Sequence, residues 1–506
     1  MSPWWTEPTG TLQERAQVVV VGSGAAGSFV ALTLAEAGLD VILLEEGFSP
    51  TRRPATMREA MQRVYAEGSF RTTMASAPMM PVVGGRGLGG STLVNSALCF
   101  RTPPATLDEW NELSAAVSPG GVFADTGAYF AVQDQVETLM RVGPTPDALL
   151  SGNDKVQKQA ARKLGWSEFN ARRNTPGCSG CGRCHLVCPH GGKNSVDREV
   201  LPRAVAAGAR VFAGCRVEGL KEGLVSGSLV DELGRTTGSF TVRAEHIVLS
   251  AGAISTPRIL HDAGLVDPDG EVGRGLCVQP VHSILAMLPD TQVFAPGATQ
   301  GHVVDEFVDD KMIFETNPTL PAMVVNLPLV GRELTEVLAN GHRIANTGGL
   351  IRDESRGRVR GSFNGVARIS YDLGEADMKR VCRVLQRGAR LWFEGADASW
   401  VGLVLHGGRL GRSMAEVEAM TPQDLSPHKL ISYASHPQAS CSVGRATDGA
   451  GQLLDLPGIS CIDASSLPNN VGRNPQISVM TVARILSLRL AERLGGRPLP
   501  LLAEPV

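Results

Sequence analysis

Apolar runs near the start of the chain predict a strand, a helix and a second strand. Residues 17–21 read QVVVV, a continuous β-branched run typical of a strand buried on both faces. Residues 29–38 read FVALTLAEAG and repeat apolar side chains at helical spacing before they stop at Gly38. Residues 41–45, VILLE, then predict a second strand that ends at Glu45. This order indicates a βαβ unit and a parallel sheet.

The turn between the first strand and the helix carries the pattern G-x-G-x-x-G. The residues of this turn that follow the pattern are Gly22, Gly24, Ala25, Ala26 and Gly27. Glycines permit the tight turn and let backbone N–H groups reach a pyrophosphate at the helix N-terminus. Glu45 is placed to accept a hydrogen bond from a ribose hydroxyl. We therefore predict dinucleotide binding, although this motif does not separate NAD from FAD.

Later segments contain further glycine-rich loops and predicted strands and helices. Residues 84–101 form a second glycine-dense loop, GGRGLGGSTLVNSALCFR, and residues 247–264 predict a strand, a small-residue turn and a helix. Near the C-terminus, residues 435–444 read SHPQASCSVG and residues 472–475 read GRNP. The run after them, ISVMTVARILSLRLAERL at 477–494, predicts a strongly amphipathic helix.

Residues 281–435 show a different pattern. Strand-like runs at 321–329, PAMVVNLPL, and at 357–371, GRVRGSFNGVARISY, alternate with a helical run at 375–396. This pattern predicts an antiparallel sheet backed by helices. The apolar run at 321–329 fits a hydrophobic substrate wall and a core strand equally well.

In this order, the segments resemble the glucose–methanol–choline (GMC) family of FAD-dependent oxidoreductases. Residues 89–95, GGSTLVN, meet the family pattern G-G-S-S-x-I-N, and the turn and helix at 251–264 are similar to its second signature. Residues 463–465, Asp-Ala-Ser, resemble the segment that lies along the flavin. The resemblance covers most of the chain and is thin over 102–175 and 281–425.

The resemblance implies an α/β fold with two kinds of domain. A Rossmann-like FAD-binding domain, a parallel sheet with helices, is expected from residues 14–105, 195–280 and 436–500. An α+β substrate-binding domain with an antiparallel sheet is expected over 281–435. The connecting region is 106–194, with a Cys-rich loop at 178–193.

The resemblance also implies which residues hold FAD. Val94 occupies the position at which some family members attach FAD through a histidine, so a non-covalent flavin is expected. The loop after His436 departs from the family, because Ala439, Ser440 and Val443 stand where Gly, Thr and Met are usual. The expected FAD-binding residues are Gly22, Gly24, Ala25, Ala26, Gly27, Glu45, Gly90, Ser91, Asn95, Val217, Ala251, Gly252, Asp463, Ala464, Asn474 and Pro475.

Two polar residues near the C-terminus are the candidates for catalysis. Oxidation of an alcohol by a flavin needs a proton acceptor and a polar group that holds the substrate oxygen. His436 and Asn474 each precede a proline, which favours an extended and well-fixed backbone. The resemblance places His436 at the family's base position and Asn474 at the paired position. For a lone histidine without this context, a satisfied structural role is the alternative.

A compact cysteine segment, CSGCGRCHLVCP, lies in the connecting region. Cys178, Cys181, Cys184 and Cys188 have the ferredoxin spacing C-x2-C-x2-C-x3-C-P, which predicts an iron–sulfur cluster of the 4Fe–4S or 3Fe–4S type. Zinc, and a structural or disulfide role, are the alternatives. Some bacterial family members carry a similar segment, so the resemblance makes it a subfamily feature. The other six of the ten cysteines are expected in the core.

Composition and charge narrow the range of partners. Hydrophobic residues make up 43% and charged residues 20% of the 506 residues, which is ordinary for a globular protein. The net charge of -3 gives no indication of nucleic acid binding. No apolar run approaches the length of a membrane-spanning helix and the N-terminus does not resemble a signal peptide, so a cytoplasmic location is expected.

Together these patterns predict an FAD-dependent alcohol dehydrogenase. His436 takes the hydroxyl proton, Asn474 orients the oxygen, and a hydride passes to the flavin. Electrons then leave for an external acceptor, a protein or a quinone, with the iron–sulfur cluster as the relay if it is present. Three alternatives stay open: an alcohol or sterol oxidase that uses O2 and has structural cysteines, a flavin-bound lyase or decarboxylase, and a non-catalytic flavin protein.

Overall fold

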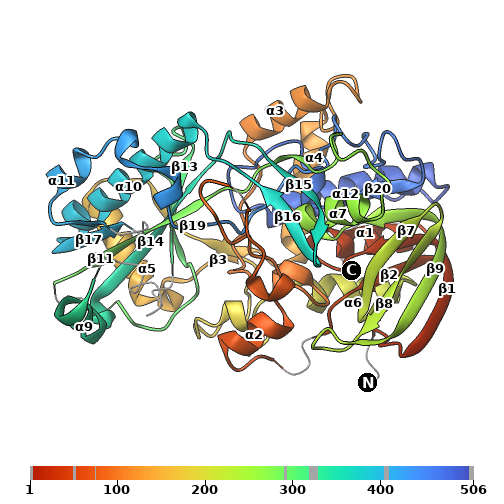
Figure 1. The fold of residues 1–506 in the computed structure, drawn as a ribbon, viewed down its shortest axis with the longest axis horizontal. Helices are drawn as coiled ribbons and strands as arrows, with labels where there is room; N and C mark the ends of the chain where they lie inside the picture. Colours follow the sequence, from red (N-terminus) through yellow and green to blue (C-terminus); the bar gives the residue numbers. More distant parts are fainter. Residues whose placement is uncertain are drawn as a thin grey trace.

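The computed structural model describes residues 4–49, 53–74, 76–289, 293–317, 329–403 and 409–500. The described chain forms two bodies that lie side by side along the longest axis (Figure 1). The body on the right in Figure 1 is built around a largely parallel sheet, and the body on the left around an antiparallel sheet. This arrangement confirms the expected fold class.

The first sheet begins with the predicted βαβ unit. β1 (Gly10–Val21), α1 (Ala25–Glu36) and β2 (Val41–Glu45) follow one another, and β1 pairs in parallel with β2. β1 begins before the QVVVV run, and its first half pairs with β9 (Thr236–Leu249). Because that first half is largely exposed, the apolar pattern marks only the buried second half of the strand.

In the described residues this sheet has seven strands in the order β6-β2-β1-β9-β8-β7, with β20 beside β9. β8 and β7 are antiparallel to their neighbours, whereas the pairs from β6 to β9 and β20 are parallel. The further strands are β6 (Arg210–Ala213), β7 (Cys215–Lys221), β8 (Leu224–Val230) and β20 (Ile459–Cys461). The helices of this body are α3 (Pro104–Ser114), α4 (Thr126–Leu139), α6 (Val196–Ala206), α7 (Gly252–Asp262) and α12 (Gln476–Arg493).

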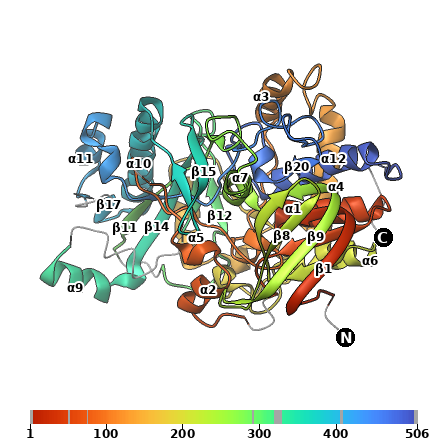
Figure 2. The same cartoon turned by 45° about the vertical axis from the view of Figure 1, so that its right-hand side comes forward.

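Alternate residues of β1 enter two different cores. Val18 and Val20 pack with residues of α1, α6 and α12, and Val19 and Val21 pack with residues of β7, β8 and α7. α1 and α12 lie side by side in this body (Figure 2). Because both faces of the strand are covered, the QVVVV run is apolar without alternation, as the sequence predicts.

α12 differs from the amphipathic helix that the sequence predicts. It is buried on every side from Gln476 to Ser487. Thr481 and Ser487 donate their hydroxyl hydrogens to backbone carbonyls one turn back, and Arg484 pairs with Glu36 at 2.7 Å. These polar side chains of α12 thus have hydrogen-bond or ion-pair partners inside the body and do not mark an exposed face. The helix lies between α1 and α4.

The second sheet is antiparallel and has eight strands within the described ranges. Their order is β18-β17-β11-β14-β13-β12-β4, with β19 beside β11. α5 (Gly152–Lys163) and α10 (Glu375–Ala396) cover one face, in agreement with the predicted sheet backed by helices. The strands are β4 (Glu168–Asn170), β11 (Val281–Met287), β12 (His302–Val304), β13 (Met312–Thr316), β14 (Ile344–Ile351), β17 (Trp400–Leu403), β18 (Arg409–Gly411) and β19 (Ser432–Tyr433).

Several elements join segments that the sequence assigns to different domains. β4 and α5 come from the connecting region, yet β4 pairs with β12 and α5 packs against α10. The predicted strand region at 357–371 forms a hairpin of β15 (Gly357–Phe363) and β16 (Val366–Ser370). This hairpin pairs with β10 (Arg274–Leu276) of the FAD-binding segment in a separate sheet. The β10–β15 pairing, with the packing of the hairpin against α7, therefore ties the two bodies together.

The remaining elements are short. Residues 321–328, most of the predicted strand PAMVVNLPL, lie outside the described residues. The six scattered cysteines are buried, as expected. Of the helices in the described residues, none is both long and apolar enough to cross a membrane. The other elements are α2 (Met57–Arg63), α9 (Gly331–Ala339), α11 (Met414–Glu418), β3 (Gly143–Pro144) and β5 (Arg172–Arg173).

Candidate active site

The first glycine loop is a tightly packed cradle in which Gly22 and Gly27 leave no room for a side chain. A Cβ atom on Gly27 would lie 1.9 Å from the carbonyl oxygen of Gly22. Gly22 has a φ of +98°, and a Cβ atom there would lie 2.6 Å from the carbonyl oxygen of Ser250. Gly24 is the N-cap of α1, Ala25, Ala26 and Gly27 form its first turn, and no described side chain caps this end. The first N–H groups of α1 are therefore left for a ligand.

Glu45 connects the two glycine loops. Its Oε2 accepts hydrogen bonds from the N–H of Ser23 at 3.0 Å and from its hydroxyl at 2.7 Å. Its Oε1 accepts from the N–H groups of Gly47 and Gly87, each at 3.0 Å. Burial raises the pKa of this carboxyl. The sequence predicts that Glu45 binds a ribose hydroxyl; the contacts that the structure shows are with the two loops, whose shape Glu45 sets.

The second glycine loop meets the first loop and the start of α12. Gly90 packs directly against Gly24, and Ser91 follows it in a short 3-10 turn. The Asn95 amide donates to Oε1 of Gln476 at 2.9 Å. Residues from three distant parts of the sequence therefore lie together at one end of α1 and α12.

Asp463 holds the turn that begins α7. Its Oδ2 accepts from the N–H of Gly252 at 2.8 Å and from the hydroxyl of Thr256 at 2.5 Å. Burial raises the pKa of this carboxyl. The carbonyl of Ala464 accepts from the N–H of Ala439 at 3.0 Å. The Asp-Ala-Ser segment therefore joins the α7 turn to the loop that carries His436.

The predicted cofactor residues fit a flavin dinucleotide. The glycines let the two loops pack against each other and against Ser250, where a Cβ atom would collide with backbone atoms, and the first turn of α1 is uncapped within the described chain. The buried hydroxyl of Ser465 also has no hydrogen-bond partner among the described residues. Ala251 and Pro475 are the N-caps of α7 and α12, and Val217 lies on β7 in the core beside β2.

Gln279 joins His436 to the segment that precedes α12. His436 is half-buried, and its Nδ1 lies 2.8 Å from the Gln279 side-chain amide. The backbone of Arg473 sets the orientation of that amide: the nitrogen donates to the carbonyl at 3.1 Å and the oxygen accepts from the N–H at 3.2 Å. The amide nitrogen then also faces His436. Burial lowers the pKa of His436 to about 4, so its ring is neutral at pH 7.

Asn474 contacts a carboxyl group that the sequence did not single out. Its Nδ2 lies 3.4 Å from Oε2 of Glu315, at the end of β13. Glu315 is 1% exposed, and burial raises its pKa to about 7. Oε1 of Glu315 and Oδ1 of Asn474 have no hydrogen-bond partner within the described ranges. The signal in the sequence is slight: one acid in the run MIFET, with no motif around it.

A buried acid holds Gln279 in an uncommon conformation. Gln279 has a φ of +50°, in the left-handed region, although it precedes a proline. Its N–H donates to Oδ1 of Asp353 at 3.0 Å, and the hydroxyl of Tyr371 donates to Oδ2 at 2.7 Å. The side chain of Asn470 also donates to Asp353. Asp353 therefore positions the residue that contacts His436.

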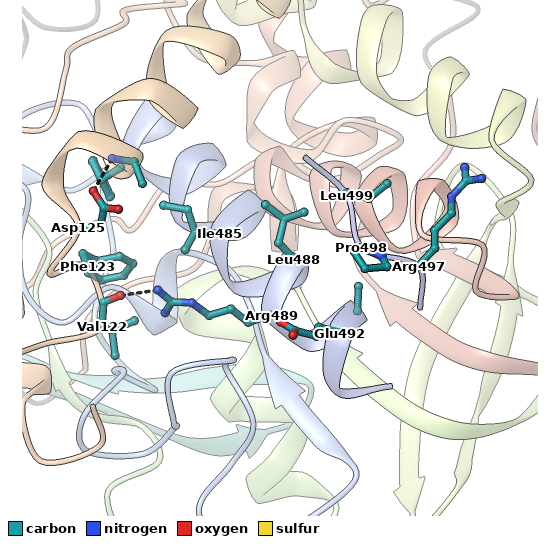
Figure 3. A pocket seen from close by; sticks show the side chains of 13 residues that line it. Val122, Phe123, Asp125, Ile485, Leu488, Arg489, Glu492, Arg497, Pro498 and Leu499 are labelled. Carbon is teal, nitrogen blue, oxygen red and sulfur yellow. Dashed lines mark hydrogen bonds between the residues drawn. The ribbon is translucent and has the colours of Figure 1, made fainter. Parts of the chain in front are cut away.

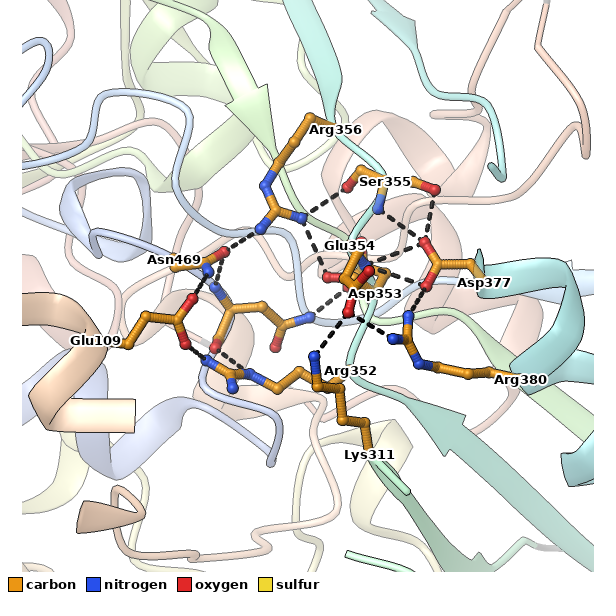
Figure 4. A network of polar contacts seen from close by, with 11 residues as sticks. Glu109, Lys311, Arg352, Asp353, Glu354, Ser355, Arg356, Asp377, Arg380 and Asn469 are labelled. Carbon is orange, nitrogen blue, oxygen red and sulfur yellow. Dashed lines mark hydrogen bonds and ion pairs between the residues drawn. The ribbon is translucent and has the colours of Figure 1, made fainter. Parts of the chain in front are cut away.

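Asp353 belongs to a wider polar network between the two bodies (Figure 4). The next residue toward β14, Arg352, forms an ion pair with Glu109 of α3. On the other side, Asp377 of α10 accepts hydrogen bonds from the backbone N–H groups after Asp353 and pairs with Arg380 at 2.7 Å. The segment that follows β14 is thus anchored to a helix of each body.

The four cysteines of the predicted cluster do not form a ligand set. In the part of the chain that the structure describes, no group of three or more His, Cys, Asp or Glu side chains is placed to hold a metal ion. Cys178 and Cys188 accept from nearby backbone N–H groups at 3.4 Å, and Cys184 accepts from Arg173 at 3.2 Å. All four, including Cys181, are free thiols. This differs from the expectation of an iron–sulfur or zinc centre, because the sulfurs are engaged separately.

The cysteine segment instead braces the second glycine loop. Lys193, which is 1% exposed, donates to the carbonyls of Leu93, Asn95 and Cys184 at 2.8, 3.0 and 3.2 Å. Burial lowers the pKa of Lys193 to about 8. Nδ1 of His185 lies 2.9 Å from the carbonyl of Val94. The segment therefore fixes the backbone next to Asn95.

A surface cavity of about 390 Å³ lies elsewhere, between α4, α12 and the chain after α12 (Figure 3). Phe123, Ile485 and Leu499 give it an apolar lining, and Arg489 donates to the carbonyl of Val122 at 2.7 Å beside it. None of the predicted site residues lines this cavity. It is separate from the site at the start of α12.

Comparisons with known proteins identify the family of this chain. Residues 16–281 match the N-terminal part and residues 353–483 the C-terminal part of the family described as GMC oxidoreductase. An uncharacterised GMC-type oxidoreductase of Mycobacterium tuberculosis is 35% identical over 495 residues, which cover 95% of this chain and 77% of that protein. A long-chain-alcohol oxidase of Arabidopsis thaliana is 25% identical over 535 residues, with 96% of this chain and 68% of that protein covered.

Solved structures share the fold. The crystal structure of pyridoxine 4-oxidase from Mesorbium loti has a TM-score of 0.66 at 19% identity, with 94% of this chain and 99% of that chain covered. A formate oxidase structure has a TM-score of 0.64 at 14% identity, with 96% and 100% covered. With two family matches over most of its length and a relative at 35% identity, this chain belongs to the GMC family of FAD-dependent oxidoreductases.

Proposed function

We propose that this enzyme uses FAD to oxidise an alcohol, a CH–OH group, to the corresponding carbonyl compound. The observation that carries the proposal is the Gln279 amide, which contacts both His436 and the backbone of Arg473, the residue before Asn474. A neutral imidazole and a side-chain amide held in this way are suited to binding a hydroxyl oxygen. When bound, FAD supplies the acceptor for a hydride.

In this proposal the chain's own residues bind and orient the substrate. His436 and Asn474 engage the hydroxyl oxygen, and Asn474 is only 8% exposed, so water is largely kept from that end of the site. Fixed polar groups in a site of low water content stabilise developing charge better than mobile water does. The name of the Arabidopsis relative, a long-chain-alcohol oxidase, supports including straight-chain alcohols among the substrates to be tested.

We further propose that electrons pass from the flavin directly to an external acceptor. The four cysteines do not form a ligand set in the described chain, so this proposal has no relay between the flavin and the acceptor. O2, a quinone and an acceptor protein remain the candidates, and the relatives named oxidases support O2. The dehydrogenase that the sequence predicts requires a quinone or a protein instead.

The test uses the flavin-loaded enzyme and a panel of straight-chain, branched and aromatic alcohols. Without oxygen, an alcohol substrate should bleach the flavin and yield one carbonyl product per flavin. In air, one hydrogen peroxide per carbonyl identifies the oxidase, whereas turnover with a quinone and without peroxide identifies the dehydrogenase. Product formation without any flavin reduction would contradict the proposal and favour a lyase or decarboxylase.

Matched variants connect the activity to the site. His436→Ala and Asn474→Ala should each slow flavin reduction by about 10²–10⁴-fold, the usual range for a lost polar or proton-transfer group. His428→Ala is the control, because His428 is exposed and lies outside the site. Equal rates in His436→Ala and the unmodified enzyme would rule out the assignment of His436.

A further inference from the structure

Oxidation of an alcohol needs a group that accepts the hydroxyl proton, and the contacts of His436 restrict its part in this step. In a neutral imidazole one nitrogen carries a proton and the other accepts a hydrogen bond. The Gln279 amide nitrogen faces Nδ1 at 2.8 Å and donates to it, so the ring proton lies on Nε2. A ring in this state donates a hydrogen bond to a substrate oxygen and has no free nitrogen lone pair with which to take a proton.

The Glu315 carboxyl, which contacts Asn474, is a second candidate to accept the hydroxyl proton. Its Oε2 is bound by the amides of Asn474 at 3.4 Å and Gln300 at 3.1 Å. Its Oε1 is buried and has no hydrogen-bond partner in the described chain, and the same holds for Oδ1 of Asn474. Unpaired buried polar atoms are costly unless a ligand completes them. Two such atoms on side chains that contact each other indicate that a polar ligand group belongs there.

The strand places Glu315 on the face that looks toward the FAD-binding body. On β13, Phe314 packs with the core of α5 and α10, whereas Ile313 packs with Leu98 and Phe100 at the end of the second glycine loop. Side chains alternate between the two faces of a strand, so Glu315 shares the face of Ile313. The helices therefore cover the opposite face, and the carboxyl is directed toward Asn474 and the flavin-binding segments.

We propose that Glu315 accepts the hydroxyl proton, while His436 donates a hydrogen bond from Nε2 to the substrate oxygen. The O–H bond breaks and its proton goes to the Glu315 carboxylate. The C–H bond breaks and its electron pair leaves as hydride for FAD, and the C=O double bond forms. This inference rests on the proposed alcohol oxidation, and it gives to Glu315 the role that the sequence assigns to His436.

The charges around Glu315 suit this role. Burial raises the pKa of Glu315 to about 7, and the hydrogen bond from Asn474 and the positive charge of Arg473 oppose that rise. Gln300 contributes a neutral amide, and Tyr433 of β19, whose pKa is raised by burial, is un-ionised near neutral pH. A base is most effective when its pKa lies near the working pH.

The first test is the pH dependence of flavin reduction by a substrate alcohol, measured by stopped flow without oxygen. The unmodified enzyme should become faster as pH rises through about 7, where Glu315 ionises. Glu315→Gln should be slower by about 10²–10⁴-fold and should lose this inflection. Glu315→Asp, which keeps a carboxyl, should retain the inflection at a reduced rate. His436→Ala should be slow but still show it.

The opposite result would overturn the proposal: an inflection that persists in Glu315→Gln and disappears in His436→Ala would make His436 the acceptor. A different failure tells the two proposals apart. If no alcohol bleaches the flavin, the alcohol oxidation itself is wrong. If alcohols bleach the flavin of Glu315→Gln at the original rate, only the role of Glu315 is wrong.

The second test does not depend on turnover. Infrared difference spectra of the flavin-loaded enzyme, titrated without substrate, should show a protonated carboxyl band that disappears as pH rises through about 7. Glu315→Gln should lack the band. Glu168→Gln on β4 of the same sheet should keep it, because hydrogen bonds from Arg162 and His302 hold the pKa of Glu168 low. A Glu315 that is already ionised at pH 5 would contradict the proposal.

Discussion

Gly90 and Gly24 touch so closely that a Cβ atom on Gly90 would lie 2.8 Å from the Cα atom of Gly24. One glycine belongs to the turn after β1 and the other to the loop before Asn95. The two glycine loops are therefore one binding surface, and a side chain at Gly90 would displace Gly24. Gly90 also has a φ of +51°, in the region that favours glycine.

Gly90→Ala should abolish tight binding of FAD. Its Cβ atom would push apart the two loops that form the cradle, and the left-handed backbone adds roughly 1–2 kcal/mol of strain. Flavin per chain after purification is the measurement. Gly264→Ala is the control: Gly264 also has a positive φ, but its Cβ atom would meet nothing within 4 Å. It should lose some stability and keep its flavin, so loss of flavin in both variants would argue against a specific contact.

Ala439→Gly should stabilise the protein slightly. Ala439 has a φ of +67°, a conformation that costs an alanine roughly 1–2 kcal/mol, and the family usually has glycine there. Part of the gain is lost because glycine has more freedom in the unfolded chain, so a net gain of about 0.5–1 kcal/mol is expected. Urea unfolding measures it. Ala376→Gly in the first turn of α10, where the backbone is right-handed, should instead cost up to about 1 kcal/mol.

The ten cysteines should divide into two classes toward a thiol reagent. Cys178, Cys181 and Cys188 are partly exposed and free, so three thiols per chain should react in the folded protein. The buried thiols should react only after denaturation; they are Cys99, Cys184, Cys215, Cys277, Cys382, Cys441 and Cys461. Iron and acid-labile sulfide are measured on the same samples. If all four cysteines of the segment fail to react with the reagent and the samples contain iron, the prediction of an iron–sulfur cluster would be supported after all.

Ionisation of Glu315 should contribute to the pH dependence of the free energy of unfolding. Its pKa is raised from 4.5 to about 7 in the folded protein, so the folded state binds more protons than the unfolded state between these values. The free energy of unfolding therefore falls as pH rises through this window, by up to about 3 kcal/mol. Glu315→Gln should lack this part of the decline. Urea unfolding of both proteins at pH 5 and pH 8 measures the difference, and parallel curves would contradict the raised pKa.

Asp353→Asn should impair catalysis as well as stability. It weakens the contacts that hold Gln279 and Asn470, and a buried hydrogen bond to a charged group contributes about 1.5–3 kcal/mol. Asp377→Asn is the matched control from the same network, since Asp377 binds the segment after β14 and Arg380. Both variants should unfold more easily, but only Asp353→Asn should slow flavin reduction in the folded enzyme.

The elements that the sequence predicted well are those in which apolar spacing reports burial directly. β2 has the bounds of the VILLE run, and α10 spans the whole helical run at 375–396. α12 was predicted at the right place with the wrong environment. Its serine and threonine hydroxyls bind the helix's own carbonyls and Arg484 binds Glu36, so polar residues there do not mark a surface.

The residues of the site also fall into those that a local motif predicts and those that it does not. The glycine loops, His436 and Asn474 lie in local motifs, and the structure brings the segments that carry them together at the starts of α1 and α12. Gln279 and Glu315 carry no such signal, because their partners are distant in sequence. Gln279 meets His436 across 157 positions, and Glu315 meets Asn474 across 159. Only the pairing of strands in the second sheet defines which acid faces Asn474.

The strand pairing that ties the two bodies has a consequence for how a substrate enters. Domains that open and close around a ligand usually turn on a few residues of a linker. Here β10 of the FAD-binding segment pairs with β15, and the hairpin of β15 and β16 packs against α7 of the first body. A hinge between the bodies would have to break the hydrogen bonds between β10 and β15 or separate the hairpin from α7. Access to the flavin is therefore expected through local movement of loops and side chains, with the two bodies moving as one.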